Sequence, residues 1–78
     1  MLKLTGPELI RILELFGFTL VRLQGSHHIL RRHVDSQAQT INIPLHRAGP
    51  LPPGMLQRLF MEISRYIPAE DLTPHFYP

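Results

Sequence analysis

The chain has 78 residues, enough for one small hydrophobic core but too few for two independent domains. Hydrophobic residues make up 44% of it and charged residues 18%, which is typical of a folded globular domain and argues against intrinsic disorder. The absence of cysteine excludes disulfides and thiolate metal sites, and it makes the cytoplasm the expected compartment. No apolar run approaches the roughly 20 residues that a membrane helix needs, so we expect no contact with a membrane.

The formal net charge is only +2, but the charges are unevenly placed along the chain. All eight basic residues precede position 67, whereas two of the six acidic residues, Glu70 and Asp71, lie in the tail. From Arg22 to Arg47, four arginines stand against the single acidic residue Asp35. Such a patch suits a polyanion, because contacts to phosphate supply most of the sequence-independent affinity for nucleic acid. A solvated polar sheet face is the simpler alternative, and charge alone favours it.

The first element in chain order is a helix that begins at a capping box. The Thr5 hydroxyl can accept a hydrogen bond from the amide of Glu8, whose carboxylate reaches back to the start of the helix. Apolar residues then recur at positions i, i+3, i+4 and i+7, which is one face of an amphipathic helix: Leu9, Ile12, Leu13 and Phe16. Gly17 follows as the residue that ends the helix.

The middle of the chain is predicted to form three antiparallel strands. Residues 18–23 and 28–34 are aliphatic-rich runs on either side of Gly25, a pattern that predicts a β-hairpin. Residues 39–43 alternate polar and apolar side chains, which predicts a third strand after a tight connection. Pro44 ends this strand because proline cannot donate to a ladder, and the proline-rich stretch 45–53 is predicted to be a loop.

A second helix is predicted to begin near Pro53 or Gly54 and to end before Pro68. Its buried stripe consists of Leu56, Leu59, Phe60, Ile63 and Ile67. Residues 68–78 contain three prolines and no periodicity, so we expect a packed or frayed tail after a single domain of residues 1–67. The order of helix, three strands and helix predicts an α+β fold. We expect a two-layer αβββα sandwich, with a three-stranded antiparallel sheet that carries both helices on one face.

Chemistry-bearing residues gather at the predicted hairpin turn, where Gly25 is followed by Ser26, His27 and His28. Histidine has the unperturbed pKa nearest neutrality, so it can accept or give a proton at cellular pH. Neighbouring strand residues project to opposite faces, so only one of the two imidazoles can serve a given site. A histidine beside a turn is, without further pattern, more often an exposed polar residue than a catalyst.

The order of these motifs resembles the HicA toxins, small mRNA interferases of bacterial toxin–antitoxin pairs. The resemblance runs from Leu4 to about Leu72 and depends on an ordered set of motifs after the initial helix: Gly17-Phe18, Arg22-Leu23-Gln24-Gly25-Ser26-His27-His28, Ile43-Pro44 and Pro53-Gly54. It implies a fold like that of the double-stranded-RNA-binding domain, in agreement with the αβββα order. The family's catalytic histidine is the third residue after the turn glycine, which is His28 here. The resemblance also implies an mRNA substrate and a HicB-like antitoxin that covers this histidine.

The residues themselves suggest how RNA would be held. Arg31 and Arg32 are candidates to stabilise charge on the phosphoryl oxygens, and they project to opposite faces of the strand, with Arg32 on the face of His28. Ser26 is expected to orient the imidazole or to bind a phosphate. Arg22 and Arg47 complete the expected phosphate contacts, and His27 is expected to be auxiliary or structural.

Such a site needs no metal or cofactor if a base removes the 2′-hydroxyl proton and the attack on phosphorus is internal, a step that suits an imidazole. A zinc site is disfavoured because adjacent strand residues diverge and no cysteine completes a tetrahedral shell around the histidines His27, His28, His33 and His46. A hydrolase triad is disfavoured because no acid is placed to orient His28 beside Ser26.

Three functions remain open at this point. The first is an endoribonuclease toxin that acts on mRNA. The second is a module of the same fold that binds double-stranded RNA by its shape and phosphates without cutting it. The third is an inactive relative that only holds a protein partner. The sequence leaves the oligomeric state open under all three.

Overall fold

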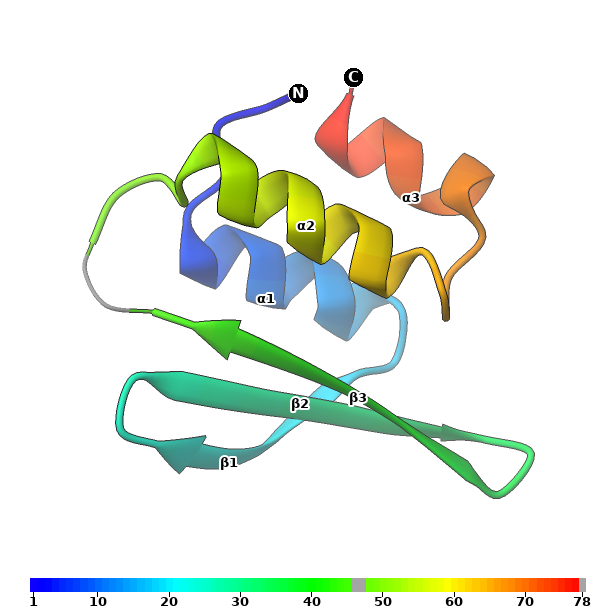
Figure 1. Ribbon diagram of the computed structural model, residues 1–78. Coiled ribbons are helices and arrows are strands. Elements are labelled where there is room, and N and C mark those ends of the chain that lie inside the picture. The colour runs from blue at the N-terminus through cyan, green and yellow to red at the C-terminus, as the bar shows by residue number, and fades with distance from the viewer. Residues whose placement is uncertain (46–47, 78) are drawn as a thin grey trace.

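The computed structural model describes residues 1–45 and 48–77 and has the predicted order of elements with one helix more. The elements are α1 (Gly6–Leu15), β1 (Thr19–Gln24), β2 (His27–Val34), β3 (Gln37–Pro44), α2 (Pro53–Ile63) and α3 (Ala69–Phe76). The strands form one antiparallel sheet in the order β1-β2-β3. Helices α1 and α2 lie on one face of this sheet, and α3 lies beyond them (Figure 1). The predicted α+β class and αβββα arrangement are therefore confirmed.

Helix α1 begins at the capping box that the sequence predicts. The amide of Glu8 donates to Thr5 Oγ1 at 3.2 Å, and the amide of Thr5 donates to Glu8 Oε1 at 2.8 Å. The backbone hydrogen bond from Thr5, followed by its hydroxyl, holds the pKa of Glu8 below its ordinary value. This cap therefore stabilises the fold at neutral pH and is lost as the pH falls through the lowered pKa. Gly17, with φ of +92°, ends the helix in the left-handed region.

The core lies between the sheet and the helices. The sheet contributes the fully buried side chains of Leu30, Ile41 and Ile43, and the two predicted helical stripes cover them. Phe16 and Phe60 from those stripes are only partly buried. Helix α2 ends at Ile63, earlier than expected, and a turn then carries the chain to the buried Ile67.

Among the described residues, no helix has both the length and the apolar character to cross a membrane.

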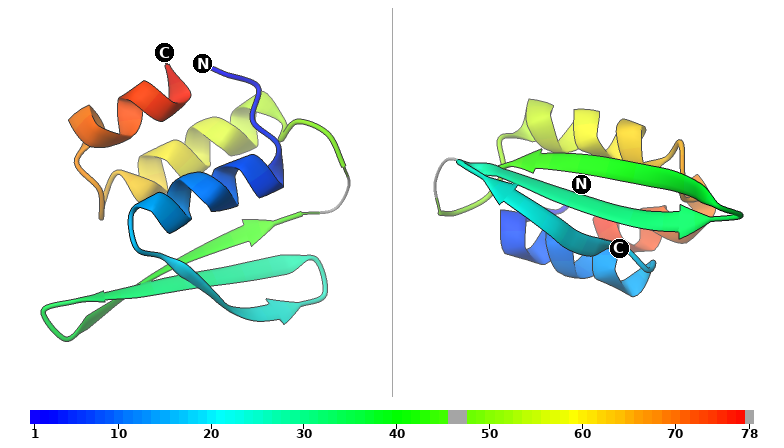
Figure 2. Two further views of the ribbon diagram at one scale, coloured as in Figure 1. Left: turned by 180° about the vertical axis from the view of Figure 1, so that it is seen from behind. Right: turned by 90° about the horizontal axis from the view of Figure 1, so that it is seen from below.

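The register of β2 decides which side chains face the helices. His28 pairs with Ile43 and Leu30 pairs with Ile41, so His28 shares its face with the core residues. The intervening side chains point to the other face of the sheet. No helix of the described residues covers that face (Figure 2). Strand β1 has a β-bulge between Leu20 and Arg22 and forms the sheet edge farther from α2.

The tail contains a helix that the sequence analysis did not predict. In α3, Leu72 and Phe76 are fully buried, and the Phe76 ring packs edge-to-face on Phe60 with centroids 5.0 Å apart. The amide of Leu2 donates to the carbonyl of Phe76 at 2.7 Å, which joins the two ends of the chain. The sequence analysis did not predict this helix because a single i,i+4 apolar pair does not establish periodicity and because Pro74 lies within the helix.

Substitution of Phe76 tests whether the tail belongs to the core. We expect Phe76→Ala to lower the free energy of unfolding by about 3–5 kcal/mol, because it leaves a cavity against Phe60. Tyr77→Ala is the matched control, because Tyr77 also contacts Phe60 but is 45% exposed, and its loss should cost about 1 kcal/mol or less. Urea unfolding followed by circular dichroism measures both. Equal losses in the two variants would mean that α3 is not part of the core.

Candidate active site

His28 lies near the start of the central strand β2, between Leu23 of β1 and Ile43 of β3. Ile43 is fully buried and Leu23 is 58% exposed, so His28 stands at the border between the covered and uncovered parts of the sheet. The residue is half-buried, and its Nδ1 atom is buried with no hydrogen-bond partner among the described residues. Buried ring nitrogens are normally paired, so this orphaned atom marks His28 as unusual.

His27 projects to the opposite face, as predicted, and is held by a residue that the sequence analysis missed. Its Nδ1 donates to Oδ1 of Asn42 on β3 at a distance of 3.0 Å. An amide oxygen only accepts, so this bond places the hydrogen of the neutral imidazole on Nδ1 and leaves Nε2 as an acceptor. Asn42 was not identifiable earlier because the pairing register of β2 and β3 brings it beside His27.

The turn between β1 and β2 is anchored to the start of α1. Gly25 has φ of +60°, which suits the turn role predicted for it. The carbonyl of Ser26 accepts from the amide of Leu45 at 2.7 Å, while its hydroxyl has no partner in the described part of the chain. Leu45 also packs so tightly on Gly6 that a Cβ at Gly6 would overlap its side chain. The start of α1 therefore lies at the same end of the molecule as His28.

Two of the predicted phosphate ligands lie on the uncovered face of the sheet. Arg22 pairs with Ile29 and is exposed, and Arg31 donates from Nε to Oγ1 of Thr40 at 3.0 Å. Both therefore project away from the face of His28. Arg47, the last predicted ligand, lies outside the described residues.

Arg32 shares the face of His28 but is held in a network within the protein. Its Nε donates to Gln39 Oε1 at 2.7 Å, its Nη1 to the carbonyl of Phe16 at 2.6 Å, and its Nη2 to the carbonyl of Tyr66 at 2.9 Å. The guanidinium also lies over the ring of Phe18, 4.8 Å from its centroid. Arg32 thus joins the sheet to the chain at the ends of α1 and α2. The sequence analysis missed this role because two of the partners are 16 and 34 residues away.

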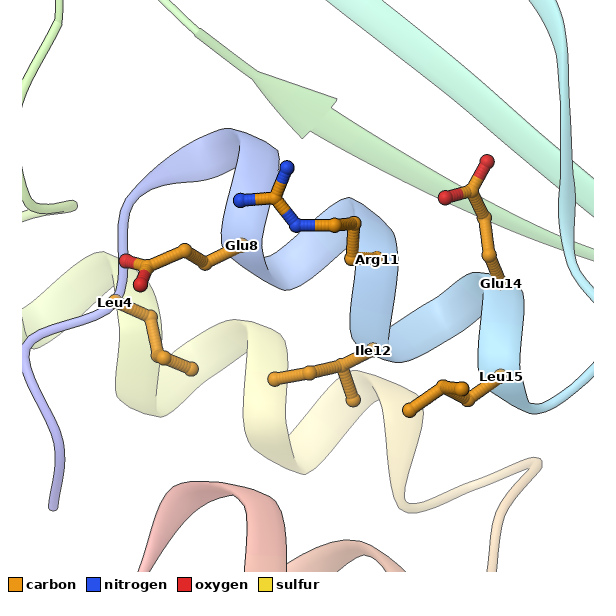
Figure 3. Close-up of a pocket in the computed structure, with 6 residues that line it drawn as sticks. All are labelled: Leu4, Glu8, Arg11, Ile12, Glu14 and Leu15. Carbon is orange, nitrogen blue, oxygen red and sulfur yellow. The ribbon is translucent and has the colours of Figure 1, made fainter.

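The hollows on the described surface include two of more than 500 Å³. The first, of about 600 Å³, runs along α1, with the apolar side chains of Leu4, Ile12 and Leu15 on one side and charged side chains on the other (Figure 3). It contains no histidine. The second, which we call the β3–α2 cleft, has a volume of about 530 Å³ and is lined by His27, Asn42, Pro44, Arg58, Leu59 and Glu62. Within the described residues, no group of three or more potential metal ligands comes together.

Comparison with family models identifies the chain. The model described as the HicA toxin of bacterial toxin–antitoxin systems matches residues 6–64, which extend from the start of α1 to just beyond α2. The chain belongs to the HicA toxin family. The resemblance predicted from the ordered motifs of the sequence is thus confirmed, and membership in the HicA family implies an antitoxin partner. Comparison with curated proteins and with solved structures gives no significant match, so the likeness to double-stranded-RNA-binding domains stays a prediction.

Substitution of Arg32 tests its structural role. We expect Arg32→Ala to lower the free energy of unfolding by about 2–4 kcal/mol, because two backbone carbonyls and Gln39 lose a charged donor. Arg32→Lys should recover little of the loss, because one ammonium group cannot reach partners on three elements. Arg31→Ala, which removes a single side-chain bond on the neighbouring residue, is the control and should cost less than about 1 kcal/mol. Urea unfolding measures all three, and equal losses at Arg31 and Arg32 would contradict the assignment.

Proposed function

We propose that this HicA-family toxin is a metal-independent endoribonuclease that cleaves mRNA with His28 as its catalytic base. The observation that carries the proposal is the placement of His28. The resemblance assigns to it the role of the family's catalytic histidine. It lies within the matched residues, and it is half-buried with an Nδ1 atom that has no partner among the described residues. If His28 served only to stabilise the fold, we would expect its buried Nδ1 to have a hydrogen-bond partner.

The proposed reaction is an internal transesterification. The imidazole of His28 takes the proton of a ribose 2′-hydroxyl, and the 2′-oxygen attacks the adjacent phosphorus as the bond to the 5′-oxygen breaks. The proton returns to that leaving oxygen, which gives a 2′,3′-cyclic phosphate and a 5′-hydroxyl. A positioned base contributes on the order of 10²–10⁴-fold to the rate of such a step. The hydroxyl of Ser26, two residues before His28, is proposed to donate to a phosphoryl oxygen.

Affinity for the RNA backbone is proposed to come from arginines outside the catalytic face. Arg22 and Arg31 lie on the uncovered face of the sheet, and neither is bound to a carboxylate among the described residues. They can therefore contact phosphates without breaking an ion pair. Arg32 is not needed for this purpose, because each of its three nitrogens already has a partner within the fold. The basic face also supports the runner-up function, an RNA-binding module that does not cut.

The proposed antitoxin is a small HicB-like protein that covers His28. On the helix-facing side of β1, Leu23 pairs with His28 and Leu20 pairs with Leu30, and these two leucines are 58% and 47% exposed. Aliphatic side chains that remain this exposed next to a catalytic group suit a protein surface that desolvates them on binding. A partner seated on them would close the approach to His28.

Cleavage of a labelled mRNA in EDTA by the partner-free protein tests the proposal. We expect the parent to cut and His28→Ala to cut at least about 100-fold more slowly, because the base is lost. His33→Ala is the matched control, since His33 lies exposed near the far end of the same strand and should leave the rate unchanged. Circular dichroism verifies that each variant is folded.

Two results would contradict this proposal. Cleavage by His28→Ala at the parental rate would exclude His28 as the base. No cleavage by the parent, together with RNA binding that weakens steeply as salt rises, would favour the non-catalytic RNA-binding module.

A further inference from the structure

The β3–α2 cleft lies beside the strand pair that carries His28. On β3, Asn42 and Pro44 flank Ile43, the partner of His28, and they point to the opposite face of the sheet. Arg58 and Glu62 enter the cleft from α2, one helical turn apart. His27, the chain neighbour of His28, also lines the cleft, so the cleft adjoins β2 beside His28.

Three polar side chains of the β3–α2 cleft keep groups that make no hydrogen bond or ion pair within the described part of the chain. Arg58 and Glu62 are spaced to form an i,i+4 ion pair, yet neither makes a hydrogen bond or ion pair within the described part of the chain. Asn42 uses Oδ1 to hold His27, and its Nδ2 group has no partner among the described residues. The cleft therefore presents a carboxylate that accepts, an amide that donates and a guanidinium cation. Its volume of about 530 Å³ lies within the range of small-ligand sites.

This set of donors and acceptors matches one nucleobase. The edge of guanine carries two adjacent donors, N1–H and N2–H, next to the acceptor O6. A carboxylate can accept both donors at once, and an amide NH₂ can donate to O6. Adenine, cytosine and uracil each offer a single donor group on that edge, so each of them leaves one oxygen of the carboxylate unpaired. Such a mismatch leaves polar groups unpaired, which is how sites built from hydrogen bonds discriminate.

We infer that the β3–α2 cleft binds a guanosine nucleotide of single-stranded RNA. Glu62 and Asn42 contact the base, and Arg58 contacts a phosphate through its guanidinium. His27 and His28 project to opposite faces, so the bound guanosine is a neighbour of the cut position and not the nucleotide that is cut. The inference rests on the proposed function in assigning RNA as the ligand, and it adds a preference for guanosine near the cleavage point.

Titration of the protein with the four ribonucleoside 5′-monophosphates, followed by amide chemical shifts, tests the cleft without requiring cleavage. We expect 5′-GMP to shift amides around Asn42, Arg58 and Glu62 and to bind at least about tenfold more tightly than the other three. Glu62→Gln should reduce this preference to about threefold or less, because an amide presents one acceptor and one donor. Glu14→Gln, which alters a carboxylate of the α1 hollow, is the control and should leave the preference unchanged.

The cleft inference is overturned if the four nucleotides bind equally, if none binds, or if the shifts lie elsewhere. Mapping of cleavage sites on an mRNA separates this inference from the proposed function. Cutting without any guanosine preference, together with no binding of 5′-GMP, removes the cleft inference and leaves the endoribonuclease. Selective binding of 5′-GMP by a protein that cuts no RNA removes the proposed function and leaves the guanosine site.

Discussion

The guanidinium of Arg32 joins the central strand to the chain at the ends of both long helices, and the remaining architecture depends on that junction. A domain of this size has one core, and only part of the sheet lies beneath α1 and α2. By donating to the carbonyls of Phe16 and Tyr66, Arg32 fixes where α1 and α2 end relative to β2. The helices are thereby held over Leu30 and the inner residues of β3, which leaves β1 largely uncovered.

The placement of His28 follows from the same arrangement. Because it alternates with Leu30 and Arg32 on one face of β2, its side chain is directed toward the helices, at the end where their cover stops. This border gives an imidazole partial burial without a fixed partner for Nδ1. A position deeper in the sheet would exclude a substrate, and a position on the outer face would be fully solvated. The border therefore suits the proposed proton transfer.

The two faces of the sheet have different chemistry. The inner face carries the core and His28, whereas the outer face carries Arg22, Arg31 and the pair of His27 with Asn42. Under the two proposals, the arginines supply affinity, His28 acts as the base, and the β3–α2 cleft selects the sequence. These three roles are carried by different residues and are therefore separable by substitution.

The sequence by itself determined the elements whose signals are local: the capping box at Thr5, the apolar stripes of α1 and α2, and the glycine turn at Gly25. It also determined the family of the chain, through the motifs that include His28. Local hydrogen bonds and periodic burial depend on residues close together in the chain, so the sequence is enough to predict them. Only the tertiary structure decided that Arg32 binds carbonyls 16 and 34 residues away, that Asn42 holds His27, and that the tail folds as α3. These features depend on strand register and on packing between distant segments, and no local pattern encodes either one.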